Sequence, residues 1–247
     1  MLYFIFSVIL VIFCVFGVSV DSYAWGPGVH INISISILEY IDKSTASMLL
    51  ANLNEYLYGS LAPDFILGKK YSKKEKNSHC WDVAFDIFNN AKTEKEKSFA
   101  YGYLTHLSAD SVAHSIMIPK ITQNSSHKNI KHFFIENCAD ARCGTRYKEL
   151  AKKTMQKYNN YLDNQFKYKV DSVLFSFAVS KLIFKSAARI SFSKKSTSVM
   201  LNEKLIKILE LHTEELGSYV ELSKKFTIDI VSKLEKSSVA KISAISK

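Results

Sequence analysis

Two histidines and an aspartate recur at four-residue intervals in AYGYLTHLSADSVAHSIMIP, residues 100–119. They are His106, Asp110 and His114. Four residues are slightly more than one turn of an α-helix, so the three side chains would form a row on one helix face. Imidazoles and a carboxylate in such a row are typical ligands of zinc or another divalent ion. A buried helix with two hydrogen-bonded histidines and a capped aspartate is the alternative, and this segment alone does not separate the two.

Further metal-binding residue types are concentrated in the same half of the chain. Six of the seven histidines lie between residues 30 and 132, and His132 and Glu136 would again share a helix face. A lone histidine or aspartate is usually an ordinary core or surface residue, but together the candidates exceed the needs of one tetrahedral site. The pattern therefore predicts a multinuclear zinc centre. The candidate ligands are His30, Asp64, His79, His106, Asp110, His114, His132 and Glu136.

The first 24 residues have the composition of a targeting segment. MLYFIFSVILVIFCVFGVSV is an unbroken apolar run, and Ser22 and Ala24 supply the small residues that signal peptidase prefers. We predict a signal peptide over residues 1–24, cleavage before Trp25, and a secreted or periplasmic protein. Because no Lys or Arg precedes the run, an uncleaved membrane anchor is the alternative.

The number of cysteines matters because the predicted export would place the protein in an oxidising compartment. After cleavage the chain would keep Cys80, Cys138 and Cys143. In an oxidising compartment this odd number predicts one disulfide and one free thiol, with a connectivity that the sequence does not reveal. A thiolate ligand for zinc is the competing interpretation, although the spacing is not that of a zinc finger.

The elements that must position these residues are predicted to be helices. The chain has 247 residues, of which 47% are hydrophobic, with only eight glycines and three prolines. Few helix breakers favour long helices over a turn-rich β sandwich. We predict one compact all-α domain over residues 25–247, with the metal ligands within residues 25–144. The alternation in residues 30–38 also fits a strand, but we favour a helix that continues unbroken through residue 57. Pro119 is expected to close the helix of residues 100–119, and Gly144 to follow the end of the next helix.

The net positive charge arises in the C-terminal part of the chain. The net charge is +10, and residues 145–247 hold 20 Lys and Arg against 10 Asp and Glu. A set of solvated helix faces is the simplest interpretation of this basic helical part. Attraction to an anionic lipid surface or to nucleic acid is the functional interpretation.

Four segments, in this order, resemble a known family: WGPGVH, PDF, GYLTHLSADSVAH and HFFIE. They resemble the bacterial zinc-dependent phospholipase C family, whose relatives include zinc nucleases that prefer single strands. The resemblance covers residues 25–144 by motif and the remainder by helical character. It implies an all-helical, exported protein with three zinc ions. It also implies that Trp25 becomes the first residue and binds metal through its own α-amine and carbonyl.

The resemblance implies two neighbouring zinc ions and a third set apart. The ligands of the first ion would be Asp64, His79, His106 and Asp110. The ligands of the second would be Trp25, His30 and a shared oxygen of Asp110. The ligands of the third would be His114, His132 and Glu136. One departure from the family pattern is that three residues separate Asp110 from His114, where the best-known members have five.

The same resemblance implies a function. The protein would be a phosphodiesterase that hydrolyses phospholipids on the glycerol side of the phosphate, by attack of a zinc-bridging hydroxide. Asp64 would orient or deprotonate the attacking water, and Phe65 matches an aromatic residue that helps to hold the headgroup. We expect a monomer that acts on a phospholipid membrane surface.

Two alternatives remain at this point. The short interval from Trp25 to His30 is closer to the nuclease branch, which would make single-stranded DNA or RNA the substrate, whereas Glu136 and PDF are closer to the lipase branch. An alternative of another class is a non-catalytic, membrane-associated helical protein in which zinc only stabilises the fold. The complete ligand set argues against it, because structural zinc sites usually close with four ligands.

Overall fold

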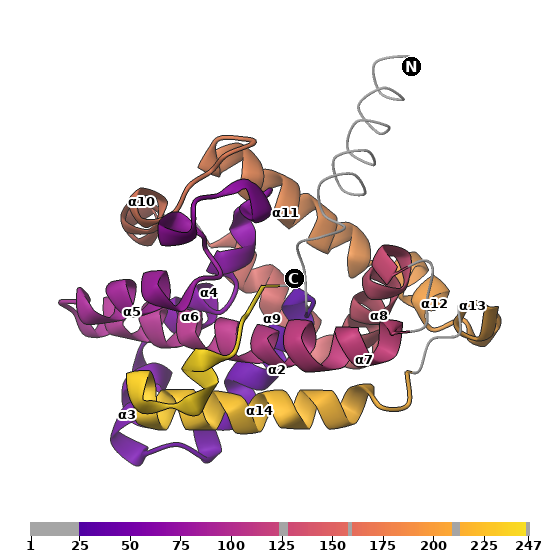
Figure 1. Cartoon of the computed structure of the whole chain (residues 1–247), viewed down its shortest axis with the longest axis horizontal. Coiled ribbons are helices and arrows are strands. Elements are labelled where there is room, and N and C mark those ends of the chain that lie inside the picture. The colour runs from indigo at the N-terminus through magenta and orange to yellow at the C-terminus, as the bar shows by residue number, and fades with distance from the viewer. Residues whose placement is uncertain (1–24, 124–127, 158–159, 209–212, 246–247) are drawn as a thin grey trace.

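A long helical rod runs through the middle of the molecule (Figure 1). It consists of α6 (Glu94–Val112), a π-helical turn η5 (Ala113–Met117) and α7 (Ile118–Thr122). The structure is a computed structural model that describes residues 25–123, 128–157, 160–208 and 213–245. Within these ranges every regular element is helical, which confirms the predicted all-α fold.

The other helices surround this rod. They are α2 (Pro27–Ser36), α3 (Lys43–Ala51), α4 (Leu53–Gly59), α5 (Trp81–Asn89), α8 (Lys128–Arg142), α9 (Thr145–Gln156), α10 (Asn160–Lys169), α11 (Phe177–Ser191), α12 (Lys194–Met200), α13 (Glu203–Ile208) and α14 (Leu216–Lys233). Single 3₁₀ turns are η1 (Ile37–Glu39), η2 (Ala62–Phe65), η3 (Lys69–Tyr71), η4 (Lys74–Lys76), η6 (Leu234–Lys236) and η7 (Ser238–Lys241).

Helix α6 is buried on all sides. It begins with a capping box, in which the Thr93 hydroxyl accepts from the Glu96 amide and the Glu96 carboxylate accepts from the Thr93 amide. From Ser98 to Val112 every residue is buried. A helix of this kind has no solvent face, so its polar side chains must find partners inside the protein. The predicted histidine and aspartate row therefore lies in the core.

Two glycines allow α4 to cross α6 in direct backbone contact. A Cβ atom on Gly59 would lie 2.0 Å from the carbonyl oxygen of Phe99, and one on Gly102 would lie 1.9 Å from that of Tyr56. No side chain fits at either position. Because η2 follows α4 at once, this crossing fixes the position of η2 relative to α6.

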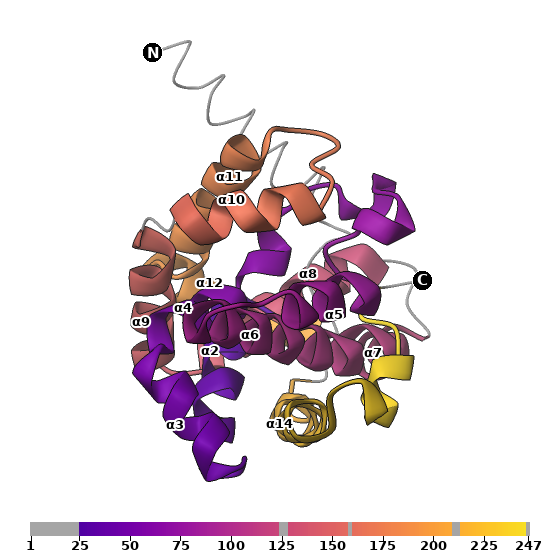
Figure 2. The ribbon, with the colours of Figure 1, turned by 90° about the vertical axis from the view of Figure 1, so that its left-hand side faces the viewer.

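The start and the end of the described chain meet on α6. The indole Nε1 of Trp25 donates to the carbonyl oxygen of Ala109 at 3.1 Å and lies 3.2 Å from the Ser223 hydroxyl of α14. Further along, the hydroxyls of Ser108 and Thr227 lie 3.2 Å apart. Helix α14 runs beside α6 in both views (Figures 1 and 2). The last long helix is therefore part of the core.

Helices α10 and α11 form an outer layer on the side of the molecule away from α3 (Figure 2). Helix α11 buries Ser180, Lys181, Phe184 and Ala188. The Lys181 ammonium pairs with the Asp163 carboxylate of α10 at 2.5 Å, which ties the two helices together.

Two predicted helix limits are wrong. The helix that begins at Pro27 is present, but it ends at Ser36 and a new helix starts at Lys43. The Asp42 side chain caps this new helix by accepting from the Thr45 amide, a local bond that competes with helix continuation. Pro119 does not end the rod either, because it lies in the first turn of α7, where a missing N–H costs little.

The prediction of a disulfide is also wrong. Cys80, Cys138 and Cys143 are all free. Cys138 lies in α8, whereas Cys143 follows the last residue of that helix. The thiol of Cys138 lies 3.0 Å from the Met200 carbonyl, whereas that of Cys143 lies against Gly28.

Gly144 follows α8 with a φ of 97°, the left-handed region that glycine adopts most easily, as expected after a helix end. The predicted signal peptide, residues 1–24, lies outside the described residues. Among the described helices none is long and apolar enough to span a bilayer.

Candidate metal centre

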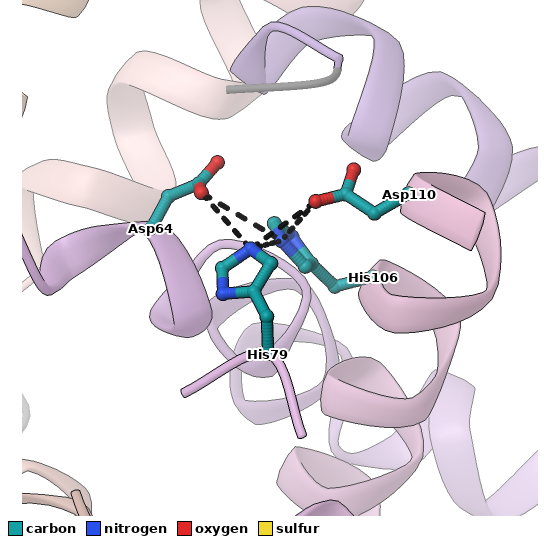
Figure 3. A group of neighbouring side chains, drawn as sticks. All are labelled: Asp64, His79, His106 and Asp110. Carbon is teal, nitrogen blue, oxygen red and sulfur yellow. Dashed lines mark hydrogen bonds and ion pairs between the residues drawn. The ribbon is translucent and has the colours of Figure 1, made fainter. Parts of the chain in front are cut away.

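Four buried side chains converge beside α6 (Figure 3). They are Asp64 of η2, His79 of the loop before α5, and His106 and Asp110 of α6. One donor atom from each lies within 4.8 Å of the other three. Asp110 Oδ2 is 3.1 Å from His79 Nε2 and 3.2 Å from His106 Nε2, and Asp64 Oδ1 is 3.4 Å from His79 Nε2. In the described part of the chain no other set of three or more such side chains is this close.

Hydrogen bonds fix the orientation of the two imidazoles. His106 Nδ1 lies 2.9 Å from the carbonyl oxygen of Ser60, which can only accept, so Nδ1 carries a proton. The Ser78 hydroxyl donates to the Pro63 carbonyl and therefore accepts from His79 Nδ1 at 3.1 Å. In the neutral form of each ring, the Nε2 lone pair thus points into the cluster.

This arrangement fits a cation. The two Nε2 atoms are 3.1 Å apart, with carboxylate oxygens of Asp64 and Asp110 beside them. Four acceptor atoms at such distances repel one another unless protons or a cation lie between them, and the Lys69 ammonium, 2.7 Å from His79 Nε2, supplies part of that positive charge. Two imidazoles and two carboxylates in a buried position are a donor set that zinc accepts. The residues therefore fit the predicted zinc.

His30 extends the cluster on the other side of Asp110. Its Nε2 lies 3.3 Å from Asp110 Oδ1, and its ring stacks on His106 with centroids 4.0 Å apart. Neither ring nitrogen of His30 and neither carboxylate oxygen of Asp110 has a hydrogen-bond partner among the described residues. Buried polar atoms are rarely left unpaired, so these orphaned atoms are a second sign of a ligand at this position.

The pKa shifts of four residues in and beside the cluster favour the protonation states that bind a metal ion. Despite burial, the neighbouring His106 holds the pKa of Asp110 well below its usual range, and Lys69 with His106 does the same for Asp64. Burial lowers the pKa of His30 and of His79. Ionised carboxylates and neutral imidazoles are the forms that bind zinc. His106 differs, since the charges of Asp110 and Asp64 raise its pKa although burial opposes them.

His114, His132 and Glu136 form a second buried group. His132 Nε2 lies 3.0 Å from Glu136 Oε1, and the rings of His114 and His132 meet edge to face with centroids 5.6 Å apart. Burial lowers the pKa of His114 to about 3 and raises that of Glu136 to about 7. His114 lies in η5, where the amide of Ile118 bonds to the carbonyl of Ala113. This wider turn separates His114 from the α-helical row of His106 and Asp110.

Trp25 and Phe65 lie next to the cluster with fully buried side chains. The Trp25 indole is bound at Ala109, one residue before Asp110. The Phe65 ring follows Asp64 and packs edge to face on Tyr58 and Phe184, each at 5.3 Å between centroids. The metal-binding role of Trp25 and the headgroup role of Phe65 stay predictions.

Sequence reasoning missed Lys69. It follows Gly68, whose φ of 72° turns the chain inward, and its ammonium is buried. Lys69 Nζ lies 3.1 Å from Asp64 Oδ1 and 2.7 Å from His79 Nε2. In a loop with five lysines, nothing in the local pattern distinguishes this one from its solvated neighbours.

Asp140 was also missed, although its spacing was a signal. It lies four residues beyond Glu136, so His132, Glu136 and Asp140 share one face of α8. Its Oδ1 accepts from the Val29 amide at 2.9 Å and so holds the start of α2, the helix that carries His30. Burial raises the pKa of Asp140 to about 7. A Cβ atom on Gly26 would lie 2.3 Å from the Asp140 carboxyl carbon, so the close approach requires glycine.

Comparison with known proteins gives one family. A family model described as zinc dependent phospholipase C matches residues 29–188. The matched region contains the eight candidate ligands other than Trp25. No curated protein matches the chain, and no solved structure matches it.

Proposed function

The chain belongs to the zinc-dependent phospholipase C family, and on this basis we propose that it hydrolyses phospholipids on the glycerol side of the phosphate. The observation that carries the proposal is the buried convergence of Asp64, His79, His106 and Asp110 within 4.8 Å. A non-catalytic zinc staple would need one such closed group. His30, whose ring nitrogens lack a hydrogen bond, and the separate group around His132 exceed that need.

We propose three zinc positions. The cluster of Asp64, His79, His106 and Asp110 would hold the first, and the second would lie between His30 and Asp110 Oδ1, with the amine and carbonyl of Trp25 as further ligands. His114, His132 and Glu136 would hold the third. Bound zinc would act as a Lewis acid toward phosphoryl oxygens and lower the pKa of water toward neutrality.

The protein's own residues would orient the reacting groups. Ser60 and Ser78 fix the rings of His106 and His79, so their lone pairs need no rearrangement during a reaction. Asp64 is kept ionised and in place by Lys69, which makes it the candidate to orient the attacking water or to accept its proton. Phe65, the next residue, would help to hold the headgroup.

Export belongs to the same proposal. Cleavage before Trp25 would free an α-amine, whose ordinary pKa of about 8 makes the neutral, metal-binding form accessible near neutral pH. If residues 1–24 stay attached, the same nitrogen is an amide, which is a poor metal ligand. We therefore expect the exported and processed form to be the active one.

A parallel assay tests the proposal. Purified processed protein, loaded with zinc, is incubated with mixed phospholipid vesicles and with single-stranded DNA. We expect release of diacylglycerol from the vesicles and close to three zinc ions per chain by elemental analysis. Nucleotide release without diacylglycerol would assign the chain to the nuclease alternative. Bound zinc with neither product would support the non-catalytic alternative.

A further inference from the structure

The outer surface of α11 carries an exposed apolar stripe. Val179, Leu182 and Ile190 have exposed fractions of 43%, 64% and 59%. Their spacing, with Ser186 between them, places them on one side of the helix, opposite the buried Lys181 and Phe184. In a helix that packs on only one side, such positions normally carry polar residues. The stripe is therefore not explained by the packing of the described residues.

Along the chain, the charged residues on and next to this stripe are all positive. From Ser172 to Asn202 the chain has five Lys and Arg residues and no Asp or Glu. Lys181 is buried and paired with Asp163. The other four cations are Lys185, which is partly exposed, and Arg189, Lys194 and Lys195, which are exposed. A surface with apolar side chains and cations is complementary to an anionic lipid bilayer.

The same surface borders the candidate metal centre. Phe184, on the inner side of α11, packs on Phe65, which follows Asp64. Before α11, the exposed Leu174 lies against Gly68, where a Cβ atom would come within 2.4 Å of Leu174 Cδ1. Lys69, the next residue after Gly68, reaches the cluster. A bilayer on this surface would therefore lie next to the loop that supplies Asp64.

We propose that this surface, called the α11 face (Leu174, Val179, Leu182, Lys185, Arg189 and Ile190), docks on an anionic phospholipid bilayer. The apolar side chains enter the interface and the cations bind lipid phosphates. This inference rests on the proposed function, because the bilayer is the proposed substrate. Single-stranded nucleic acid is less suited, since a hydrated phosphate backbone would leave Leu182 in water. A second copy of the chain is disfavoured because two α11 faces repel each other.

The test separates docking from hydrolysis. Binding of the zinc-loaded protein is measured by co-sedimentation with phosphatidylcholine vesicles containing roughly 30 mol% phosphatidylglycerol. Activity is measured separately on a short-chain phosphatidylcholine below its micelle concentration, which needs no docking. Val179→Ser/Leu182→Ser should weaken vesicle binding by about tenfold. Lys185→Gln/Arg189→Gln should weaken it by about tenfold at low salt and much less at high salt.

Leu50→Ser is the matched control. Leu50 has an exposed fraction of 56% and belongs to α3, a helix on the opposite side of the molecule from α11 (Figures 1 and 2). It should bind vesicles as the unaltered protein does, and all variants should keep full activity on the monomeric substrate. The proposal is overturned if both α11 variants bind vesicles normally, or if Leu50→Ser weakens binding equally. It is also overturned if the two α11 variants bind vesicles normally and lose only single-stranded DNA binding or self-association.

The two proposals can fail separately. Vesicle binding that depends on α11, without hydrolysis of the vesicle lipids or of the short-chain lipid, would reject the proposed enzymatic function and support the docking surface. Hydrolysis of the monomeric lipid, with vesicle binding that the α11 substitutions do not change, would support the proposed enzymatic function and reject the docking surface.

Discussion

The Oδ1 oxygen of Asp110 lies 3.3 Å from Nε2 of His30, while Oδ2 of the same carboxylate faces His79 and His106. One ionised group thus serves histidines on two sides. An amide cannot replace it as a metal ligand on both sides, because its NH2 nitrogen has no free lone pair to offer a metal ion.

Asp110→Asn should therefore weaken zinc binding about a hundredfold and reduce kcat/KM by at least as much. Chelator competition and elemental analysis measure the first effect, and lipid hydrolysis measures the second. Asp86→Asn, which alters an exposed carboxylate paired with Lys169, is the matched control and should change neither. Normal zinc content in Asp110→Asn would exclude a shared role for this carboxylate.

The glycine contact between α4 and α6 predicts a large stability effect. In Gly102→Ala, the new methyl group would lie 1.9 Å from the Tyr56 carbonyl oxygen, so the two backbones must separate. We expect the free energy of unfolding to fall by about 3 kcal/mol, measured by urea titration. Gly217→Ala is the control, since nothing lies within 4 Å of its Cβ position. Equal stability of the two variants would show that the crossing is looser than described.

Asp140 should act as a positioning residue for α2. Asp140→Ala leaves the buried Val29 amide without its acceptor, at a cost of about 1–3 kcal/mol, and releases the segment that carries His30. We expect lower stability and weaker zinc binding. Asp140→Asn keeps an acceptor oxygen of the same shape and should restore most of both. If Asn is as harmful as Ala, the charge of Asp140 matters and its acceptor geometry does not.

Glu96 should contribute a pH-dependent part of the stability. Although burial alone would raise it, hydrogen bonds from Tyr161, Gln165 and the amides of Lys92 and Thr93 lower the pKa of Glu96 from 4.5 to about 2. A lowered folded-state pKa stabilises the protein above the unfolded value, and this contribution is lost as the pH falls from 4.5 toward 2.

Unfolding of metal-free protein across this range measures the effect. The difference in unfolding free energy between the unaltered protein and Glu96→Gln should be largest above pH 4.5 and shrink toward pH 2. Lys97, the next residue, offers Lys97→Gln as a control whose difference should not follow pH in this window. A constant difference for Glu96→Gln would contradict the assignment.

Local patterns were sufficient for much of the candidate site. The four-residue spacings of His106 with Asp110 and of His132 with Glu136 depend only on helix geometry, and the structure places each pair on one helix. The all-α fold followed from the scarcity of glycine and proline. The capping signal at Asp42 is present in the sequence, but no glycine or proline marks a break in this segment, so one continuous helix is predicted.

The remaining features depend on tertiary contacts. Lys69 contacts His79 across a folded loop, and Asp140 contacts Val29, which is 111 residues away on another helix. The absence of a disulfide depends on the different neighbours of the two thiols, Met200 for Cys138 and Gly28 for Cys143. No residue pattern in this segment predicts the π-helical turn at His114.

The bonds of the Trp25 indole have a consequence for how the protein is made. Its partner Ser223 is separated from it by 198 residues and lies beyond residue 188, where the family match ends. During synthesis, Trp25 can therefore form its bond to Ser223 only after α14 has been made. A chain truncated after residue 188 would lack α14 and leave one side of α6 uncovered. The stretch shared with the family is thus shorter than the unit that folds.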